Sequence, residues 1–212
     1  MSIFLILLTV ALSYLIGSIP TAFIFGKVFR GIDIREHGSK NIGATNAVRV
    51  LGKALGFTVL FLDILKGVLP VVFVAGLLSP DVNGRILSAV AAVCGHNWTC
   101  FLNFKGGKGV ATSLGVLIGL SIVIPPLRIA VLLTVLGWLA VFLCTAYVSV
   151  ASIVAGLLLP VLVVVFMAPF QVTFLAILFG IFVIFRHRPN IQRLMTGQEP
   201  QVPIPFHPAS RK

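Results

Sequence analysis

Acidic residues are scarce in this sequence. Among its 212 residues only five are acidic, namely Asp33, Glu36, Asp63, Asp81 and Glu199, and charged residues of both signs make up only 10%. A soluble domain of this length needs far more charge to cover its surface, so lipid must solvate most of this chain. So few carboxylates also make a two-metal carboxylate site implausible.

Cysteine is scarce too. Cys94, Cys100 and Cys144 lie in or beside apolar segments and form no C-x-x-C pair. Neither a disulfide framework nor a zinc site is therefore indicated. We expect no metal and no other cofactor.

Apolar residues dominate instead: they make up 58% of the chain, and the mean hydropathy is +1.12. A membrane-spanning helix needs about 20 such residues. Seven apolar segments can be marked, at about Ile3–Val28, Ala54–Leu78, Ile86–Phe104, Val110–Ile124, Leu127–Thr145, Val148–Ala168 and Phe170–Phe185. The sequence therefore predicts an all-α, polytopic helical bundle of about seven transmembrane helices. It forms one domain over residues 1–199, and a proline-rich peripheral tail follows at 200–212.

Basic residues cluster in alternate connections between these segments. One side holds twelve, Arg30, Arg35, Lys40, Arg49, Lys53, Lys105, Lys108, Arg186, Arg188, Arg193, Arg211 and Lys212, and the other holds Arg85 and Arg128. Positive charge marks the cytoplasmic side, so the N-terminus is expected outside and the C-terminus in the cytoplasm. The net charge of +11 favours anionic lipid headgroups and anionic substrates as partners, with no nucleic acid.

The first polar stretch on that side is GSKNIGATN at residues 38–46, with Arg49 after it. Small residues let a ligand approach the backbone, and Ser, Asn and Thr offer hydrogen bonds. Arg49 can bind a phosphate through two hydrogen bonds. An ordinary polar loop that caps a helix at Thr45 or Asn46 explains the pattern equally well.

The second polar stretch interrupts an apolar segment at Gly95-His96-Asn97-Trp98 and continues as FKGGKGVAT at residues 104–112. Glycines and lysines that open a helix can form an anion-binding nest of free backbone N–H groups. It is not a nucleotide P-loop, because Leu102 and Gly109 stand where that motif needs Gly and Ser or Thr. A basic turn at the membrane surface is the alternative.

Two further sets of polar residues are separated by helical spacing. His187 and Asn190 stand three apart in RHRPNIQRL at residues 186–194, on one face if this segment is helical. Asp63 and Lys66 have the same spacing inside an apolar segment. Ionisable groups there are costly and usually paired or functional, and we expect a mutual ion pair that supports the site.

These motifs identify the chain as similar to a known family. GSKNIGATN at 38–46, LDILKG at 62–67, FKGGKGVAT at 104–112 and RHRPNIQRL at 186–194 resemble those of the bacterial acyl-phosphate:glycerol-3-phosphate acyltransferases, integral membrane enzymes of phospholipid synthesis. The resemblance implies a seven-span bundle in the bacterial inner membrane, with its active site on the cytoplasmic face. Two departures stand out: Lys40 replaces a frequent glycine, and a proline common after His96 is missing.

The resemblance also implies a reaction. An acyl group passes from acyl phosphate to the 1-hydroxyl of sn-glycerol-3-phosphate, giving 1-acylglycerol-3-phosphate and phosphate. The implied partners are these two substrates, membrane lipid and a soluble enzyme that makes acyl phosphate. The candidate catalytic residues are Ser39, Lys108, His187 and Asn190, and the candidate substrate-binding residues are Asn41, Thr45, Asn46, Arg49, His96, Lys105, Gly106, Gly107, Gly109, Thr112 and Arg193.

Two questions stay open on the sequence. No obvious general base lies near the glycines, so either a substrate phosphate oxygen takes the hydroxyl proton, with His187 orienting, or His187 is itself the base. A basic cavity with broken helices also fits a permease for a phosphorylated solute, although we find no inverted repeat.

Overall fold

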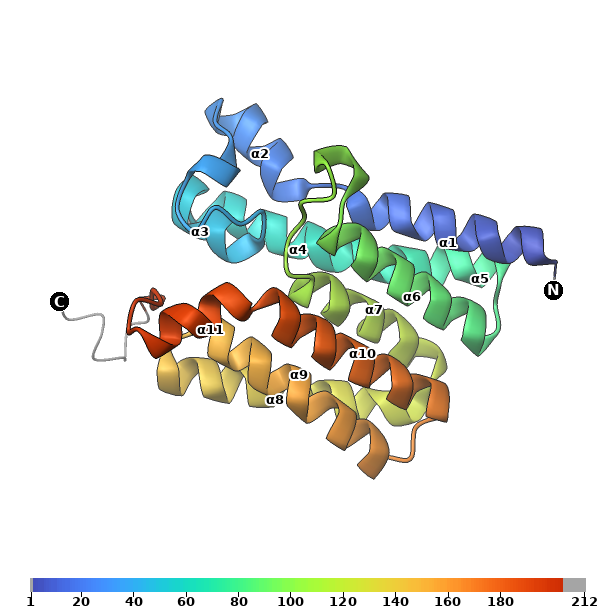
Figure 1. Cartoon of the computed structure of the whole chain (residues 1–212). Helices are drawn as coiled ribbons and strands as arrows, with labels where there is room; N and C mark the ends of the chain where they lie inside the picture. Colours follow the sequence, from blue (N-terminus) through green and yellow to red (C-terminus); the bar gives the residue numbers. More distant parts are fainter. Residues whose placement is uncertain (1, 204–212) are drawn as a thin grey trace. The chain divides into compact units, whose positions relative to one another are not determined.

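All the regular secondary structure in residues 2–203, the part of the chain that the computed structural model describes, is helical, as the sequence predicts. The chain divides into two compact units, Met1–Val123 and Ile124–Lys212, called here the N-terminal and C-terminal units (Figure 1). Helices suit this composition because they satisfy every backbone N–H and C=O within the segment, which lipid cannot do.

The N-terminal unit is built on two close helix pairs. Helix α1 packs against α6, and α4 packs against α7, with α2 and α3 completing the unit at one end of α4. The elements are α1 (Ile3–Ser18), α2 (Thr21–Arg30), the 3₁₀ turn η1 (Ile34–Glu36), α3 (Ala44–Leu51), α4 (Lys53–Leu69), the π-helical turn η2 (Pro70–Val74), α5 (Ala75–Leu78), α6 (Val82–Asn97), the 3₁₀ turn η3 (Cys100–Leu102) and α7 (Val110–Val123).

Glycines allow both pairs to approach closely. A Cβ on Gly17 of α1 would overlap the backbone of Ala92 in α6, and a Cβ on Gly115 of α7 would overlap the backbone of Ile64 in α4. In lipid no hydrophobic effect drives helices together, so small residues that allow close packing are common at helix contacts. Between α1 and α6, the Ser13 hydroxyl also lies 2.8 Å from that of Ser88.

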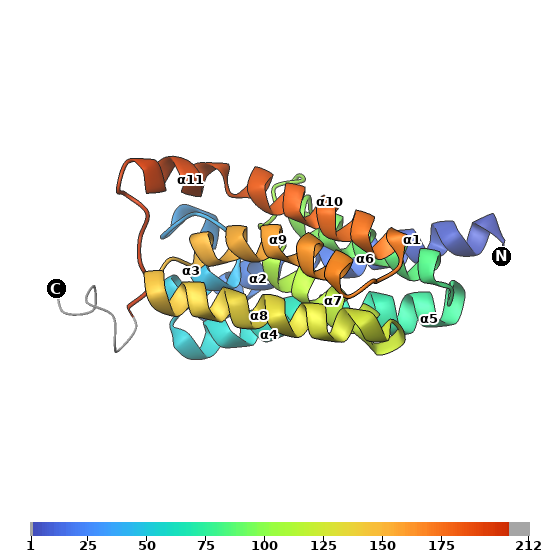
Figure 2. The same cartoon turned by 90° about the horizontal axis from the view of Figure 1, so that it is seen from below.

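The C-terminal unit is a simpler bundle. Helix α9 (Val148–Val165) packs against α8 (Pro125–Thr145) and α10 (Phe170–Arg186), and the three lie side by side in both views (Figures 1 and 2). Helix α11 (Arg188–Met195) follows α10 after a bend of 54°. The segment beyond it returns to the α8–α9 turn, where Val202 N–H donates to the Ala146 carbonyl at 2.9 Å.

All seven predicted apolar segments are largely helical, with two differences in detail. The first is broken at Ile19–Pro20, between α1 and α2, because Pro20 has no N–H and disfavours helical backbone at the residue before it. The third stops being a regular helix at Asn97. The expected interruption near residues 95–112 is therefore present.

Length separates these helices into two groups. Within residues 2–203, four stretches are long and apolar enough to cross a membrane, or five if the bent pair α10 and α11 counts as one span, whereas α7 is short. The total of seven spans and the orientation of the termini stay predictions. The proline-rich tail beyond residue 203 lies outside the described residues.

Candidate active site

The break between α1 and α2 is the centre of a buried polar cluster in the N-terminal unit. The Lys66 ammonium lies 2.8 Å from Asp63 Oδ1, so the expected ion pair is present, and the two side chains are only 6% and 2% exposed. Thr21 donates its hydroxyl to the same carboxylate oxygen at 2.9 Å. Lys66 also donates to the carbonyl of Ile19 at 2.7 Å. The pair thus has hydrogen-bond partners on both sides, as a buried pair requires.

This cluster explains how a broken helix survives at its position. The last carbonyl groups of a helix have no N–H donor within the helix, and lipid offers no donor to replace it. The Lys66 ammonium donates to the Ile19 carbonyl, and the Thr99 hydroxyl donates to the Ser18 carbonyl at 2.6 Å. Sequence reasoning missed Thr21 and Thr99, because their partners lie 42 and 81 positions away.

His96 connects this cluster to the glycine-rich loop. Its ring is 5% exposed and its Nδ1 lies 4.0 Å from Asp63 Oδ1. On the other side the ring lies directly over Gly107, where any Cβ would overlap Nε2. The structure therefore brings the predicted residues Asp63, Lys66, His96 and Gly107 together.

The predicted nest of free N–H groups at Gly106 and Gly107 is wrong. The N–H of Gly106 donates to the Asn97 carbonyl at 3.2 Å, and that of Gly107 donates to the His96 carbonyl at 3.0 Å. Both N–H groups thus pair with the last carbonyl groups of α6, which have no donor within the helix. The glycines are needed instead for close approach, since a Cβ on Gly106 would overlap the backbone of His96 and Asn97.

The N-terminus of α7 is the remaining candidate for the anion-binding element of this loop. The first-turn N–H groups of a helix have no intrahelical partner and carry a partial positive charge. Gly109 precedes this turn with φ 76°, a backbone conformation that glycine adopts most readily. Lys105 is exposed, Lys108 is partly buried and Thr112 is fully buried.

The first predicted loop, residues 38–46, is organised by Asn46. This side chain is 1% exposed, and its Oδ1 accepts the Ser39 N–H at 2.8 Å. Its Nδ2 lies within hydrogen-bond distance of the carbonyls of Ile34, His37 and Asn41. The prediction that Asn46 binds substrate directly is not supported, since its amide holds the loop instead.

The remaining predicted residues of this loop lie where a ligand can reach them. Ser39, Thr45 and Arg49 are exposed and Asn41 is partly buried. Lys40 adopts a left-handed backbone with φ 60°, which costs a non-glycine residue on the order of 1 kcal/mol. Glycine would adopt this conformation without that cost.

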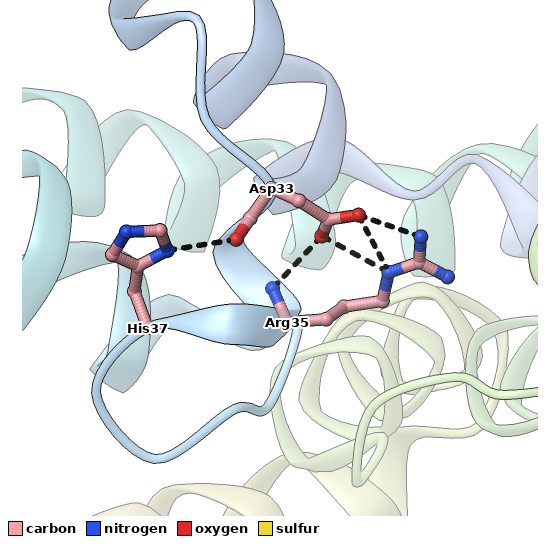
Figure 3. Close-up of polar contacts among 3 residues, drawn as sticks. All are labelled: Asp33, Arg35 and His37. Carbon is pink, nitrogen blue, oxygen red and sulfur yellow. Dashed lines mark hydrogen bonds and ion pairs between the residues drawn. The ribbon is translucent and has the colours of Figure 1, made fainter.

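An ion pair on the surface shapes the chain just before this loop (Figure 3). The Arg35 guanidinium donates to both oxygens of Asp33, at 3.0 Å to Oδ1 and 2.7 Å to Oδ2. These hydrogen bonds lower the pKa of Asp33 from 3.8 to about 2. His37 Nδ1 lies 2.9 Å from the Asp33 carbonyl, so the three residues fix the turn at η1.

The C-terminal unit holds the other predicted residues in a separate arrangement. His187 is 2% exposed, and its Nδ1 lies 2.8 Å from the Val183 carbonyl. Since a carbonyl only accepts, Nδ1 carries a proton, and in the neutral ring Nε2 is then the acceptor nitrogen. His187 stands at the bend just before α11 and Asn190 lies in its first turn, so a face shared by the two side chains stays a prediction.

Glu199 is the residue that sequence reasoning missed in this unit. Its carboxylate accepts from Asn190 Nδ2 at 2.6 Å and from Arg193 Nε at 2.8 Å. Burial alone would raise the pKa of Glu199, but these hydrogen bonds and the Arg193 charge outweigh it, so the pKa lies below 4.5. Asn190 and Arg193 were predicted to meet substrate, and the structure places both against this carboxylate.

The helices and these sites define a multi-pass membrane protein with polar centres at the ends of its helices. A family model described as glycerol-3-phosphate acyltransferase matches residues 7–197. A glycerol-3-phosphate acyltransferase of Fusobacterium nucleatum is 43% identical over 190 residues, covering 90% of this chain and 94% of that protein. Glycerol-3-phosphate acyltransferase 2 of Moorella thermoacetica is 45% identical, covering 91% and 95%.

Solved structures agree with this result. The crystal structure of the integral membrane glycerol 3-phosphate acyltransferase PlsY in its glycerol 3-phosphate form has a TM-score of 0.84 and 41% identity, covering 93% of this chain and 95% of that one. Its lysophosphatidic acid form has a TM-score of 0.81 and the same identity. The chain belongs to the glycerol-3-phosphate acyltransferase family and is an acyltransferase. The permease alternative is set aside.

Proposed function

We propose that this enzyme transfers a fatty acyl group from acyl phosphate to the 1-hydroxyl of sn-glycerol-3-phosphate. The hydroxyl oxygen bonds to the acyl carbon, the bond from that carbon to the phosphate oxygen breaks, and inorganic phosphate leaves. The product is 1-acylglycerol-3-phosphate. Because acyl phosphate is a mixed anhydride, it needs no enzyme nucleophile, and positioning supplies much of the rate.

The observation that carries this proposal is the glycine-lysine loop held between His96 and the start of α7. Gly106 and Gly107 tie the loop to the end of α6 through two backbone hydrogen bonds. Lys105 and Lys108 then supply positive charge beside a helix N-terminus, an arrangement suited to a phosphate group. Ser39 of the loop and Arg49 of α3, both exposed, are the further candidate contacts for substrate.

The hydroxyl proton passes to an oxygen of the substrate phosphate in this mechanism. His187 is the alternative acceptor, because the neutral ring that donates Nδ1–H to the Val183 carbonyl has its basic nitrogen at Nε2. The two routes differ in their response to His187→Gln. That variant abolishes the rise of kcat with pH near the histidine pKa only if His187 takes the proton.

The test is the formation of 1-acylglycerol-3-phosphate by purified protein, with phosphate release measured alongside when acyl phosphate is the donor. We expect turnover with acyl phosphate and glycerol-3-phosphate, in the presence of EDTA, and none with acyl-CoA as donor. Equal rates with acyl-CoA would contradict the donor assignment, and loss of activity in EDTA would contradict the expectation that no metal is needed. A second arm supplies acyl phosphate through the soluble enzyme that makes it, which is the proposed functional partner.

We place the active site on the cytoplasmic face of the bacterial inner membrane. The twelve-to-two division of basic residues supports this side. Single cysteines at positions 40, 105 and 193 should be protected from an impermeant reagent in intact cells, and one at position 83 should react. Labelling at the exposed position 105 from outside would overturn the assignment.

A further inference from the structure

Asn97, the last residue of α6, carries a buried amide with no hydrogen bonds. Its side chain is 0% exposed, and within residues 2–203 neither Oδ1 nor Nδ2 has a protein partner. Buried polar groups almost always have one, because leaving a donor or an acceptor unpaired costs free energy. This amide therefore calls for a functional explanation.

The position of the amide indicates where its partner binds. Asn97 Oδ1 lies over Gly109, and a Cβ there would be only 2.5 Å from it. Gly109 caps the start of α7 by accepting the Ser113 N–H at 2.7 Å. Three residues after Gly109, Thr112 is also 0% exposed, and its Oγ1 has no partner among the described residues. Both unpaired groups thus lie beside the glycine-lysine loop.

The chemistry of the amide selects its ligand. A carboxamide offers one acceptor oxygen and a donor NH₂, so it is satisfied by a group that both donates and accepts. A hydroxyl does so, whereas a fully ionised phosphate ester only accepts. Lys105, Lys108 and the α7 N-terminus already suit the anionic end of a phosphate-bearing substrate.

We propose that Asn97 recognises a hydroxyl of the acceptor's glycerol backbone and so determines acceptor specificity. This inference rests on the proposed function. The Thr112 hydroxyl is the second group that hydrogen-bonds to the glycerol backbone of the acceptor. Because Asn97 is fully buried, the hydroxyl reaches it only when the loop at residues 105–109 moves away from the end of α6. A buried water that bridges these groups is the competing explanation.

The test compares two ligands that differ only in hydroxyl groups, glycerol-3-phosphate and propyl phosphate. Sites that hydrogen-bond a substrate hydroxyl discriminate strongly against analogues without it. We expect calorimetry on the purified enzyme to show at least about tenfold tighter binding of glycerol-3-phosphate. In Asn97→Leu the two ligands should bind about equally, with the affinity for propyl phosphate unchanged. Each lost hydrogen bond is worth roughly tenfold in affinity.

The unfolding temperature separates a ligand-binding role from a structural one. Removing an unpaired buried amide should leave the unfolding temperature of Asn97→Leu unchanged or raise it, since the apolar side chain loses no hydrogen bond. Asn83→Leu is the matched control, because Asn83 is exposed near the other end of α6; it should keep the full preference. Thr112→Val, which has nearly the same shape, should reduce the preference in the same direction.

Each other outcome contradicts the proposal. A lower unfolding temperature in Asn97→Leu with the preference intact would assign the amide to the fold or to a structural water. Equal weakening toward both ligands would assign it to the phosphate. Wild-type enzyme that binds both ligands equally would also overturn the inference, even if turnover of acyl phosphate upholds the proposed function. If Asn97→Leu does not insert, Thr112→Val with unchanged preference decides against it.

Discussion

Two ion pairs of the N-terminal unit have nearly the same geometry in opposite surroundings. Asp63 and Lys66 lie 2.8 Å apart, and Asp33 and Arg35 lie 2.7 Å apart. The first pair is almost fully buried, whereas the Arg35 side chain is 38% exposed. Distance alone therefore says little about the importance of a charge pair. What each pair holds in place, and what surrounds it, decides the effect of removing it.

The largest effect is expected from Asp63→Ala. It leaves Lys66 buried without its counter-charge, which typically costs about 3–5 kcal/mol. Lys66→Met removes that stranded charge but also the bond to the Ile19 carbonyl, so the double variant should be more stable than Asp63→Ala yet less stable than wild type. Thermal unfolding in detergent measures both. An Asp63→Ala variant as stable as Asp33→Ala would remove the contrast between the pairs.

The next effect tests what the buried pair supports. Gly107→Ala places a Cβ against the His96 ring, which has Asp63 on its other side, so the loop must shift away from α6. We expect turnover to fall at least about 10²-fold, the effect of a displacement near 1 Å. Gly76→Ala is the matched control, because its Cβ would meet only the Arg85 guanidinium, at 3.6 Å or more. Full activity in Gly107→Ala would show that the loop position is not critical.

Glu199 is intermediate between the two pairs, since its own side chain is buried but that of its partner Arg193 is 34% exposed. Glu199→Gln should lower the free energy of unfolding by about 1–3 kcal/mol, the scale of hydrogen bonds to a charged group. Because folding lowers the pKa of Glu199 from 4.5, its stabilisation is complete above that value and is lost as the pH falls through the lower folded pKa. The difference between wild type and variant should therefore shrink in acid. The exposed Gln198 gives a control, Gln198→Ala, with no such trend.

The smallest effect is expected from Asp33→Asn. A surface pair contributes at most about 1 kcal/mol and is screened by salt. The folded pKa of Asp33 is about 2 against 3.8, so its contribution is present above pH 4 and disappears between about pH 4 and pH 2. Chemical unfolding at low and high salt would measure it. A loss above 2 kcal/mol at neutral pH would mean that η1 is critical to the loop after it.

Sequence patterns predicted those features that depend on near neighbours. The spacing of Asp63 and Lys66 identified their ion pair, and the run of polar residues after Gly95 identified the end of α6. The C-terminal unit is different in this respect. There Glu199 bonds to Asn190 and Arg193 only because the chain turns back after α11, and no periodicity indicates that return.

The glycine-rich loop shows a second limit of sequence reasoning. Its pattern correctly marks an unusual backbone, yet it cannot say which carbonyls its N–H groups meet. Gly106 and Gly107 bond to the end of α6 rather than standing free. The break at Ile19–Pro20 is a similar case: proline predicts a break, but the partners that make it tolerable, Lys66 and Thr99, come from distant segments.

The pairing of α1 with α6 has a consequence for synthesis of the chain. Ser13 meets Ser88, 75 positions later, so α1 leaves the ribosome well before its partner exists. During that interval Ser13 and Gly17, both buried in the finished unit, face lipid or the insertion machinery. Chains that stop before α6 should therefore carry a first helix without its partner, open to quality-control proteases and to small-residue contacts with other helices.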